Sequence, residues 1–206
     1  MTAATWLLRP WVRPVVLALA LAPLAGWIWG IATSSLGPNP AEALLRGTGL
    51  WTLRLLIITL AITPLRLWFG LPALARWRRM LGLTASGYAL LHFLAYAWLD
   101  MGFIWPDILA DVPRRPFILV GTLAWLLLLA LALTSFQRAV RLMGGARWQA
   151  LHRSVYAVAA LAVLHFYWMR AGKNDFAEVA VYAALLVGLL LWRLWYLRRR
   201  VMLSAR

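Results

Sequence analysis

The sequence contains no cysteine and few charged residues. Without cysteine, the chain can form no disulfide, thiolate metal site, iron–sulfur cluster or cysteine nucleophile. Charged residues make up 13% of the 206 residues and hydrophobic residues 64%, which is too little charge to cover the surface of a soluble domain of this length. We therefore predict an all-α integral membrane protein that folds as one helical bundle over residues 1–206.

Acidic residues are scarce, and the formal net charge is +15. Such a charge would suit a nucleic-acid-binding protein, but the basic residues lie at the ends of apolar runs and form no continuous stripe. We therefore expect no nucleic-acid partner. Basic residues at one set of helix ends instead fix the orientation of a membrane protein among lipids.

Six long apolar runs are present, each near the ~20 residues that a helix needs to cross ~30 Å of hydrocarbon. They are too long and too uniformly apolar to be strands of a membrane barrel. The predicted transmembrane helices cover residues 15–33, 48–68, 80–99, 117–135, 150–169 and 177–197. The first run is longer than the apolar region of a signal peptide and no clear A-x-A site follows it, so we expect a retained span.

Cations and acids lie on opposite sides of this predicted bundle. One set of connections and chain ends carries only cations: Arg9, Arg13, Arg66, Arg76, Arg78, Arg79, Arg138, Arg141, Arg147, Arg153, Arg193, Arg198, Arg199, Arg200 and Arg206. The other set carries five cations and all six acids: Arg46, Arg114, Arg115, Arg170, Lys173, Glu42, Asp100, Asp107, Asp111, Asp175 and Glu178. The positive-inside rule then places both termini in the cytoplasm. The acidic outer loops are either a partner's docking surface or ordinary solvated loops.

Two of the three histidines lie inside apolar spans at similar depth. Counted from Met80, His92 lies about 18 Å into the third span, and counted from Ala150, His165 lies about 22 Å into the fifth. Both spans run in the same direction, so the two imidazoles can face each other in the outer half of the bilayer.

Two facing histidines suit the axial ligation of a haem iron, because neutral imidazole is a good ligand and the macrocycle is apolar. Small residues on the same helix faces would let a flat ring approach, and these are Ala85, Ala89, Ala95 and Ala162. The alternative is a pair of histidines that bond neighbouring helices without a cofactor. Zinc or copper is disfavoured, because no carboxylate or third ligand lies at that depth.

The third histidine, His152, lies at the cytoplasmic end of the fifth span. On an ideal helix its side chain points about 140° away from that of His165, so it would ligate a second, inner haem only on a tilted or distorted helix. Otherwise it faces headgroups. Fourteen residues before His92 stands Arg78, a poor iron ligand that binds carboxylate and phosphate well. The inner site then suits a haem with one protein ligand, a flavin phosphate or a quinone.

Arg54 lies within the second span, where an unpaired cation is costly. We expect either a haem propionate as its partner or a side chain that snorkels to the outer surface. No acid is expected to be buried with it, which disfavours a transporter with paired charges near the midplane.

Several stretches resemble a known family. They are "LGPNPAEALLRGTGLWTLRLL", "TLAITPLR", "RRMLGL", "YALLHFLAY", "RRPFILVGTLAWLLLLALALTS", "RWQALHRSVY" and "LAVLHFYW", and they run from about residue 36 to residue 168. In this order they resemble the MsrQ family, also called YedZ, within the ferric-reductase-like transmembrane superfamily.

The resemblance implies a haem b subunit of a periplasmic methionine sulfoxide reductase system in the bacterial inner membrane, with one or two haems and an FMN. Electrons would pass from the quinone pool or a cytoplasmic flavin reductase to a periplasmic catalytic subunit that carries molybdopterin. The resemblance maps haem histidines onto His92, His152 and His165, places an arginine of the inner site at Arg78, and implies a ferric-reductase-like core over about residues 48–169.

Two other functions remain open from the sequence. One is a haem cytochrome that reduces ferric iron or another periplasmic acceptor. The other is a cofactor-free membrane scaffold or small transporter. Direct oxidation of NAD(P)H by this chain is not expected, because the sequence holds no G-x-G-x-x-G motif.

Overall fold

The structure is a computed structural model that describes residues 7–204. Within that range the chain folds into helices and contains no strand. Six helical segments are long and apolar enough to cross a membrane: Val12–Ala32, Pro40–Trp68, Pro72–Asp100, Pro116–Leu133, Gly145–Ala171 and Ala177–Arg199. The predicted all-α class and the six spans are therefore confirmed, and the chain is a multi-pass membrane protein. The cytoplasmic placement of the termini stays a prediction; Arg206 and the side chain of Arg200 lie outside what the structure describes.

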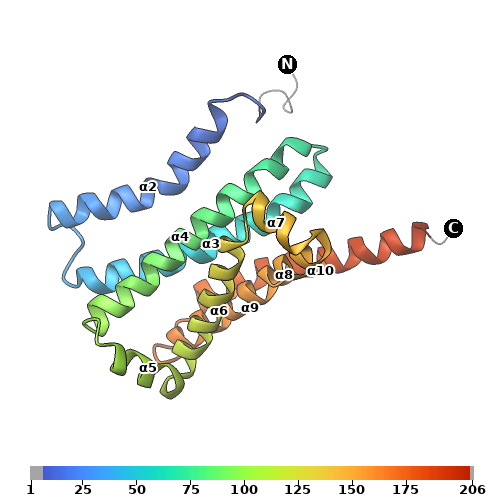
Figure 1. The fold of residues 1–206 in the computed structure, drawn as a ribbon. Helices are drawn as coiled ribbons and strands as arrows, with labels where there is room; N and C mark the ends of the chain where they lie inside the picture. The colour runs from blue at the N-terminus through green and yellow to red at the C-terminus, as the bar shows by residue number, and fades with distance from the viewer. Residues whose placement is uncertain (1–6, 205–206) are drawn as a thin grey trace.

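Figure 1 shows the order of the elements along the chain. They are α2 (Val12–Ala32), α3 (Pro40–Trp68), η1 (Pro72–Arg76), α4 (Trp77–Ala95), η2 (Tyr96–Asp100), α5 (Trp105–Arg114), α6 (Pro116–Leu133), α7 (Gln137–Met143), α8 (Gly145–His152), α9 (Val155–Ala171) and α10 (Ala177–Ser204). The connections α2–α3, α4–α6 and α9–α10 lie at one end of the bundle, and α3–α4 and α6–α9 at the other.

Two antiparallel helix pairs form the centre of the bundle. Helix α4 packs along α3, α9 packs along α6, and α4 also contacts α6. The largest fully buried side chains come from these helices: Leu55, Leu56, Tyr88 and Val158. The Tyr88 hydroxyl donates to the Ala20 carbonyl at 2.9 Å and so fixes α2 against the first pair.

Helix α3 begins at Pro40, eight residues before the predicted start at 48. The side chain of Asn39 accepts the Glu42 N–H at 3.1 Å, and Pro40 occupies the first helical position. An Asn cap followed by proline starts a helix, so the polar stretch before residue 48 is helical. The predicted bound was wrong because it followed hydropathy and not the cap.

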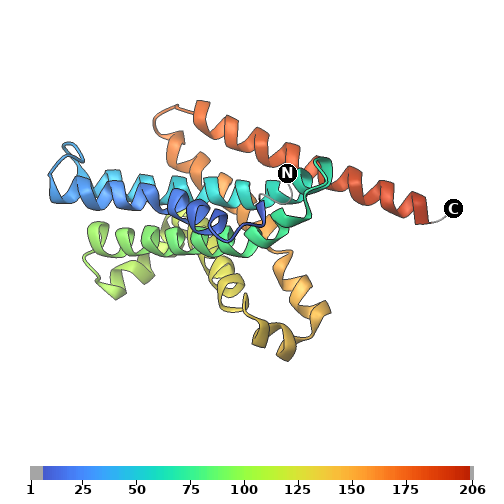
Figure 2. The same cartoon turned by 90° about the horizontal axis from the view of Figure 1, so that it is seen from above.

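The fifth span is not one continuous helix. Helix α8 ends at His152, the chain turns through Arg153 and Ser154, and α9 begins at Val155. Helices α7 and α8 project away from α3 and α10, as the second view shows (Figure 2). A short helix, α5, lies in the connection between α4 and α6, outside the predicted spans.

Candidate functional site

The two histidines at matched depth come together between the helix pairs. His92 lies on α4 and His165 on α9, and their ring centres are 6.0 Å apart with planes at 83°. A metal–imidazole bond is about 2.0 Å long and the ring centre lies ~1.1 Å behind the nitrogen, so two axial imidazoles on one metal place their centres roughly 6 Å apart. The observed separation fits that arrangement.

Each histidine uses its Nδ1 atom to bond a backbone carbonyl on the partner helix of its pair. His92 Nδ1 donates to the Leu45 oxygen at 2.9 Å, and His165 Nδ1 donates to the Phe117 oxygen at 2.7 Å. A carbonyl only accepts, so Nδ1 carries the proton in both rings and Nε2 keeps its lone pair. Bonds of this kind orient metal-ligating histidines and set their tautomer.

A glycine makes room for each ring. A Cβ built on Gly49 of α3 would lie 3.0 Å from His92 Cε1, and one on Gly121 of α6 would lie 2.8 Å from His165 Nδ1. Each glycine follows the accepting carbonyl by four residues, since Leu45 precedes Gly49 and Phe117 precedes Gly121. The two helix pairs thus hold their histidines in the same way: a carbonyl and, one helical turn later, a glycine.

A cavity of ≈ 360 Å³ lies between α3, α4, α6 and α9 and is lined by both histidines. This volume lies within the ~300–1,000 Å³ typical of cofactor and ligand pockets. Phe93 of α4 stacks on Trp125 of α6, with ring centres 4.2 Å apart, and the pair forms part of the wall. Of the four alanines expected beside a flat ring, Ala89 and Ala162 line the cavity, and Ala85 and Ala95 do not.

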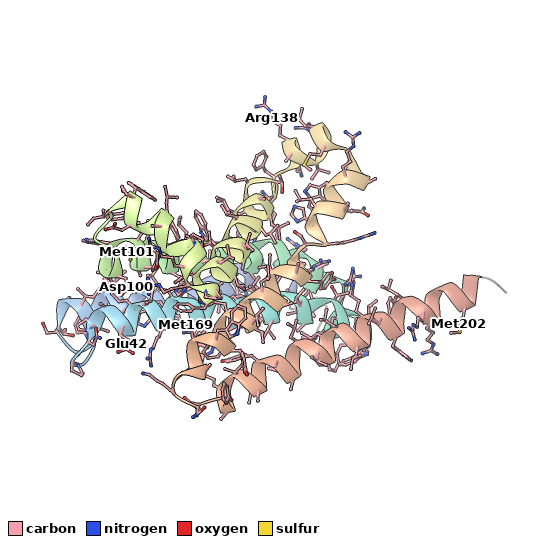
Figure 3. All side chains as sticks on the ribbon, turned by 90° about the horizontal axis from the view of Figure 1, so that it is seen from below. Glu42, Asp100, Met101, Arg138, Met169 and Met202 are labelled. Atoms are coloured by element: carbon pink, nitrogen blue, oxygen red, sulfur yellow. The ribbon has the colours of Figure 1, made fainter. Side chains whose placement is uncertain are left out.

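One end of the cavity is charged and the rest is mostly apolar. The charged lining residues stand at helix ends, and they are Glu42, Arg46, Asp100, Arg115, Arg170 and Glu178. Figure 3 shows Glu42 and Asp100 at the same end of the bundle as the lining residue Met169, far from Arg138 on α7. We call this charged end the mouth of the cavity. An apolar interior with a charged mouth suits an amphipathic, flat cofactor.

Arg115, at the junction of α5 and α6, is held by Asp111. Its Nε donates to Asp111 Oδ1 at 2.5 Å and its Nη2 donates to Oδ2, while the Tyr96 hydroxyl donates to Oδ2 at 2.6 Å. The bonds from Arg115 hold the pKa of the Asp111 carboxyl below its ordinary value. Asp111 is therefore a stable anion that fixes one guanidinium at the mouth.

Arg54 does not line this cavity. Its Nε donates to the Tyr182 hydroxyl at 2.7 Å, its Nη2 lies 3.6 Å from Glu178 Oε1, and its guanidinium lies over the Trp51 ring at 5.2 Å. The expectation that no acid accompanies Arg54 was wrong, because Glu178 at the start of α10 reaches it. The structure gives the arginine protein partners and places other arginines nearer the cavity.

His152 lies apart from the other two histidines and does not line the cavity. Its ring stacks on Trp148, with centres 4.0 Å apart, and its Nε2 lies 3.1 Å from Thr134 Oγ1. That hydroxyl donates to the Ala130 carbonyl at 2.7 Å, so it accepts from His152 and Nε2 carries the proton. His152 thus has the opposite tautomer to that of His92 and His165.

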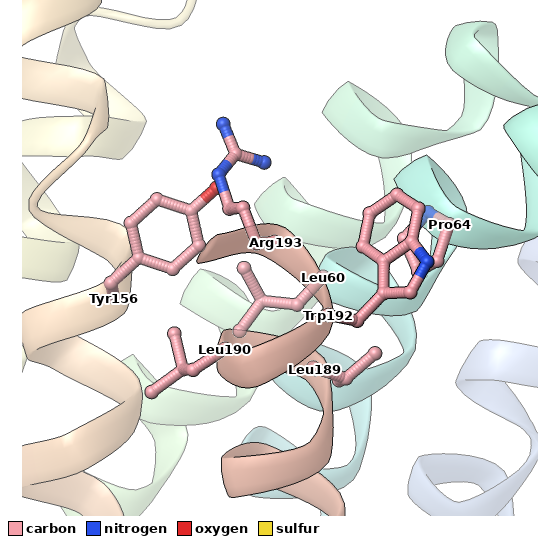
Figure 4. A pocket seen from close by; sticks show the side chains of 7 residues that line it. All are labelled: Leu60, Pro64, Tyr156, Leu189, Leu190, Trp192 and Arg193. Atoms are coloured by element: carbon pink, nitrogen blue, oxygen red, sulfur yellow. The ribbon is translucent and has the colours of Figure 1, made fainter. Parts of the chain in front are cut away.

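Arg78 stands at the start of α4, within electrostatic range of His152, Tyr156 and Arg193. Near it is a crevice of ≈ 10 Å³, where Arg193 lies over the Tyr156 ring and Trp192 lies beside Pro64 (Figure 4). A space of that size holds about one water, so a flavin or quinone that uses Arg78 would lie outside this crevice.

The two histidines, His92 and His165, suit a metal ion whose other ligands come from a cofactor. Among residues 7–204, no group of three or more histidine, cysteine or acidic side chains stands close enough to hold a bare ion. Two neutral imidazoles with ring centres 6.0 Å apart in a mostly apolar cavity suit a haem iron, because the porphyrin supplies the remaining ligands.

Leu45, Gly49, Phe117 and Gly121 were missed from the sequence as parts of the site. Glycine is unfavourable inside a helix and often marks a close approach, and glycine is common where membrane helices pack closely. Gly49 and Gly121 could therefore have indicated a close approach. The accepting carbonyls of Leu45 and Phe117 are backbone atoms, so no residue type in the sequence marks them.

Comparison with known proteins identifies the family. The model of the family described as "Ferric reductase like transmembrane component" matches residues 48–163. The chain is 55% identical over 190 residues to the protein-methionine-sulfoxide reductase heme-binding subunit MsrQ of Polaromonas naphthalenivorans, covering 92% of this chain and 87% of that one. It is 50% identical to MsrQ of Bordetella pertussis, with 91% and 92% covered, and 47% identical to MsrQ of Ralstonia nicotianae, with 91% and 87% covered. No solved structure matches. The chain therefore belongs to the MsrQ family of ferric-reductase-like transmembrane proteins.

Proposed function

We propose that the chain is a haem-binding electron-transfer subunit of a methionine sulfoxide reductase system in the bacterial inner membrane. One observation carries the proposal: His92 and His165 stand 6.0 Å apart with both Nδ1 protons given to carbonyls, which leaves both Nε2 atoms as ligands. The similar proteins are named heme-binding subunits of protein-methionine-sulfoxide reductase, which supports the assignment.

In this proposal His92 and His165 hold the iron of one haem b, which supplies reversible one-electron chemistry when bound. The carbonyls of Leu45 and Phe117 keep the rings oriented, so little rearrangement is needed on binding. Aromatic and aliphatic side chains, with Phe93 against Trp125, exclude water from the ring faces. The haem-binding core spans about residues 48–169.

The two ends of the bundle have different roles in the proposal. Electrons enter on the side of Arg78, Arg79, Trp148 and His152, from the quinone pool or from a cytoplasmic flavin reductase. They leave at the acidic end, where a periplasmic subunit carrying molybdopterin docks. That subunit performs the methionine sulfoxide chemistry, so this chain needs no pocket for the substrate.

His152 and Arg78 serve a second cofactor on the donor side in this scheme, either an inner haem or the FMN that the family resemblance implies. For His152 to ligate iron through Nε2, it must first release Thr134. A ligating His152 needs a local distortion of the fifth span, and the break between α8 and α9 supports one. Because His152 and His165 lie on separate helices, the angle of about 140° expected on one ideal helix does not apply to them.

The test is to purify the chain in detergent and measure haem and flavin per polypeptide. We expect a red protein with the low-spin spectrum of two imidazole ligands and at least one haem b per chain. Co-expression with a periplasmic molybdopterin subunit should yield a complex in which that subunit is reduced through this chain. A colourless protein that stays folded and binds no added haem would refute the proposal.

A second function is favoured by the family match over residues 48–163, which is to a ferric-reductase-like component. A cytochrome of this kind would reduce ferric iron or another periplasmic acceptor directly. The two functions share the haem and differ in the acceptor. Rapid reoxidation of the reduced protein by chelated ferric iron, with no reoxidation by the molybdopterin subunit, would favour this second function.

A further inference from the structure

The mouth of the cavity gathers three arginines from three different helix ends. Arg46 comes from the first turns of α3, Arg115 from the residue before α6, and Arg170 from the end of α9. Two of them are close in sequence to a residue that positions a histidine, since Arg46 follows Leu45 and Arg115 precedes Phe117 by two residues. Arg170 lies five residues after His165 on the same helix.

Every one of these arginines is held by a carboxylate. Arg46 pairs with Glu42, and Arg115 pairs with Asp111 through two nitrogens. Arg170 donates to Asp175 at 3.0 Å. Arg170 also donates to Glu178 at 3.3 Å. A guanidinium has five N–H donors, so two bonds to chain carboxylates leave capacity for a further one. The side chains of Arg115 and Arg170 are only 39% and 21% exposed.

A haem has two carboxylates on one edge and is otherwise apolar, so it binds with that edge toward the polar end of a cavity. Here the polar end is the mouth, and arginine is the side chain best suited to carboxylate because its planar fork can give two parallel hydrogen bonds. Arg54, deeper in α3, is bonded to Tyr182 and Glu178 and does not line the cavity.

We propose that Arg46, Arg115 and Arg170 bind the two propionates of the haem, with Arg115 held in position by Asp111 and Tyr96. This inference rests on the proposed haem-binding function and adds to it the residues that orient the cofactor. The arginines also set its reduction potential, because a nearby positive charge disfavours the ferric state relative to the ferrous state.

The experiment compares purified Arg46→Gln, Arg115→Gln and Arg170→Gln with the wild type. The matched control is Arg114→Gln, which removes the same charge one residue away at an exposed position outside the cavity. Each of the three substitutions is expected to lower the haem midpoint potential and to speed haem transfer to apomyoglobin by roughly tenfold or more, the equivalent of one lost charged hydrogen bond. The propionate bending modes in the resonance Raman spectrum should shift, and the control should match the wild type in all three readouts.

A second measurement distinguishes the loss of an arginine–propionate contact from a change in the folding of a variant. Wild type and variants are loaded with haem dimethyl ester, whose propionates cannot pair with arginine as anions. The difference in haem transfer rate between Arg115→Gln and the wild type should then disappear, and the transfer rate of Arg115→Lys with ordinary haem should fall between those of Arg115→Gln and the wild type. Transfer rates equal to that of the wild type in all three variants, or rate differences that persist with the ester, overturn the inference and leave the haem site intact. A wild type without haem overturns both the inference and the proposed function.

Discussion

His92 and His165 stand with ring centres 6.0 Å apart and planes at 83° although 72 residues lie between them in the chain. Neither ring is placed by its own helix alone. Each is fixed by a carbonyl and a glycine on the partner helix, Leu45 and Gly49 for His92 and Phe117 and Gly121 for His165. Two similar helix pairs thus present one histidine each to the same cavity.

The first prediction concerns the ligands themselves. His92→Ala and His165→Ala should each abolish the low-spin bis-imidazole absorption spectrum, because a single remaining imidazole cannot complete six-coordinate iron. His152→Ala should keep that spectrum and lose at most an inner cofactor. The spectrum of the dithionite-reduced protein in detergent checks this, and full intensity in either of the first two variants would contradict the assignment.

The second prediction concerns the glycines. Gly121→Ala places a methyl 2.8 Å from His165 Nδ1 and should displace the ring, while Gly49→Ala, at 3.0 Å from His92 Cε1, should have a smaller effect of the same kind. We expect a cost of about 1–3 kcal/mol from overpacking and weaker haem retention. Gly87→Ala on α4 is the control, because nothing lies within 4 Å of its added methyl. Equal haem content in Gly121→Ala and Gly87→Ala would show that the close approach has no role.

The third prediction follows from the angle between the rings. Perpendicular imidazole planes leave two iron d orbitals close in energy, which gives an electron paramagnetic resonance signal dominated by one feature at high g. Parallel planes give a three-line rhombic spectrum instead. With planes at 83°, the oxidised protein should show the high-g feature. A rhombic spectrum from the His152→Ala variant would mean that the rings turn on binding.

The fourth prediction concerns pH and the Asp111–Arg115 pair at the mouth. The pKa of Asp111 is lower in the folded protein than its ordinary value of 3.8, chiefly because Arg115 donates hydrogen bonds to it. The folded state therefore binds fewer protons than the unfolded state, so the pair stabilises the fold fully above that ordinary value and less as pH falls through the lowered pKa.

Asp111→Asn should accordingly lower the unfolding temperature in detergent at pH 5 to 7, and its difference from the wild type should narrow below pH 3.8. Asp107→Asn, at an exposed position on the same helix, is the control. If the difference in unfolding temperature between the wild type and Asp111→Asn stays constant across this pH range, the Asp111–Arg115 ion pair does not cause it.

Much of the fold could be predicted from the sequence, and the reasons are physical. Hydrophobic runs of bilayer length report transmembrane helices directly, and counting residues along two parallel spans gave matched depths for His92 and His165. Hydropathy does not detect helix caps or short polar helices, so the start of α3 at Pro40 and the presence of α5 were not predicted.

The site's details depend on which helices pack together, and a single sequence does not determine that. The carbonyls of Leu45 and Phe117 are backbone atoms, so no residue type marks them as partners of a histidine. Glu178 reaches Arg54 from a helix more than a hundred residues away. The arginines at the mouth looked like ordinary loop cations, and only the cavity groups Arg46, Arg115 and Arg170 together.

The proposed function depends on His92 and His165 binding one haem together. Its most direct test is the haem content and axial ligation of purified His152→Ala, in which only this pair of histidines remains. We expect one haem b per chain, with the near-infrared magnetic circular dichroism band of two imidazole ligands. A folded His152→Ala protein that lacks haem, or whose haem is high-spin with a single imidazole, would contradict it.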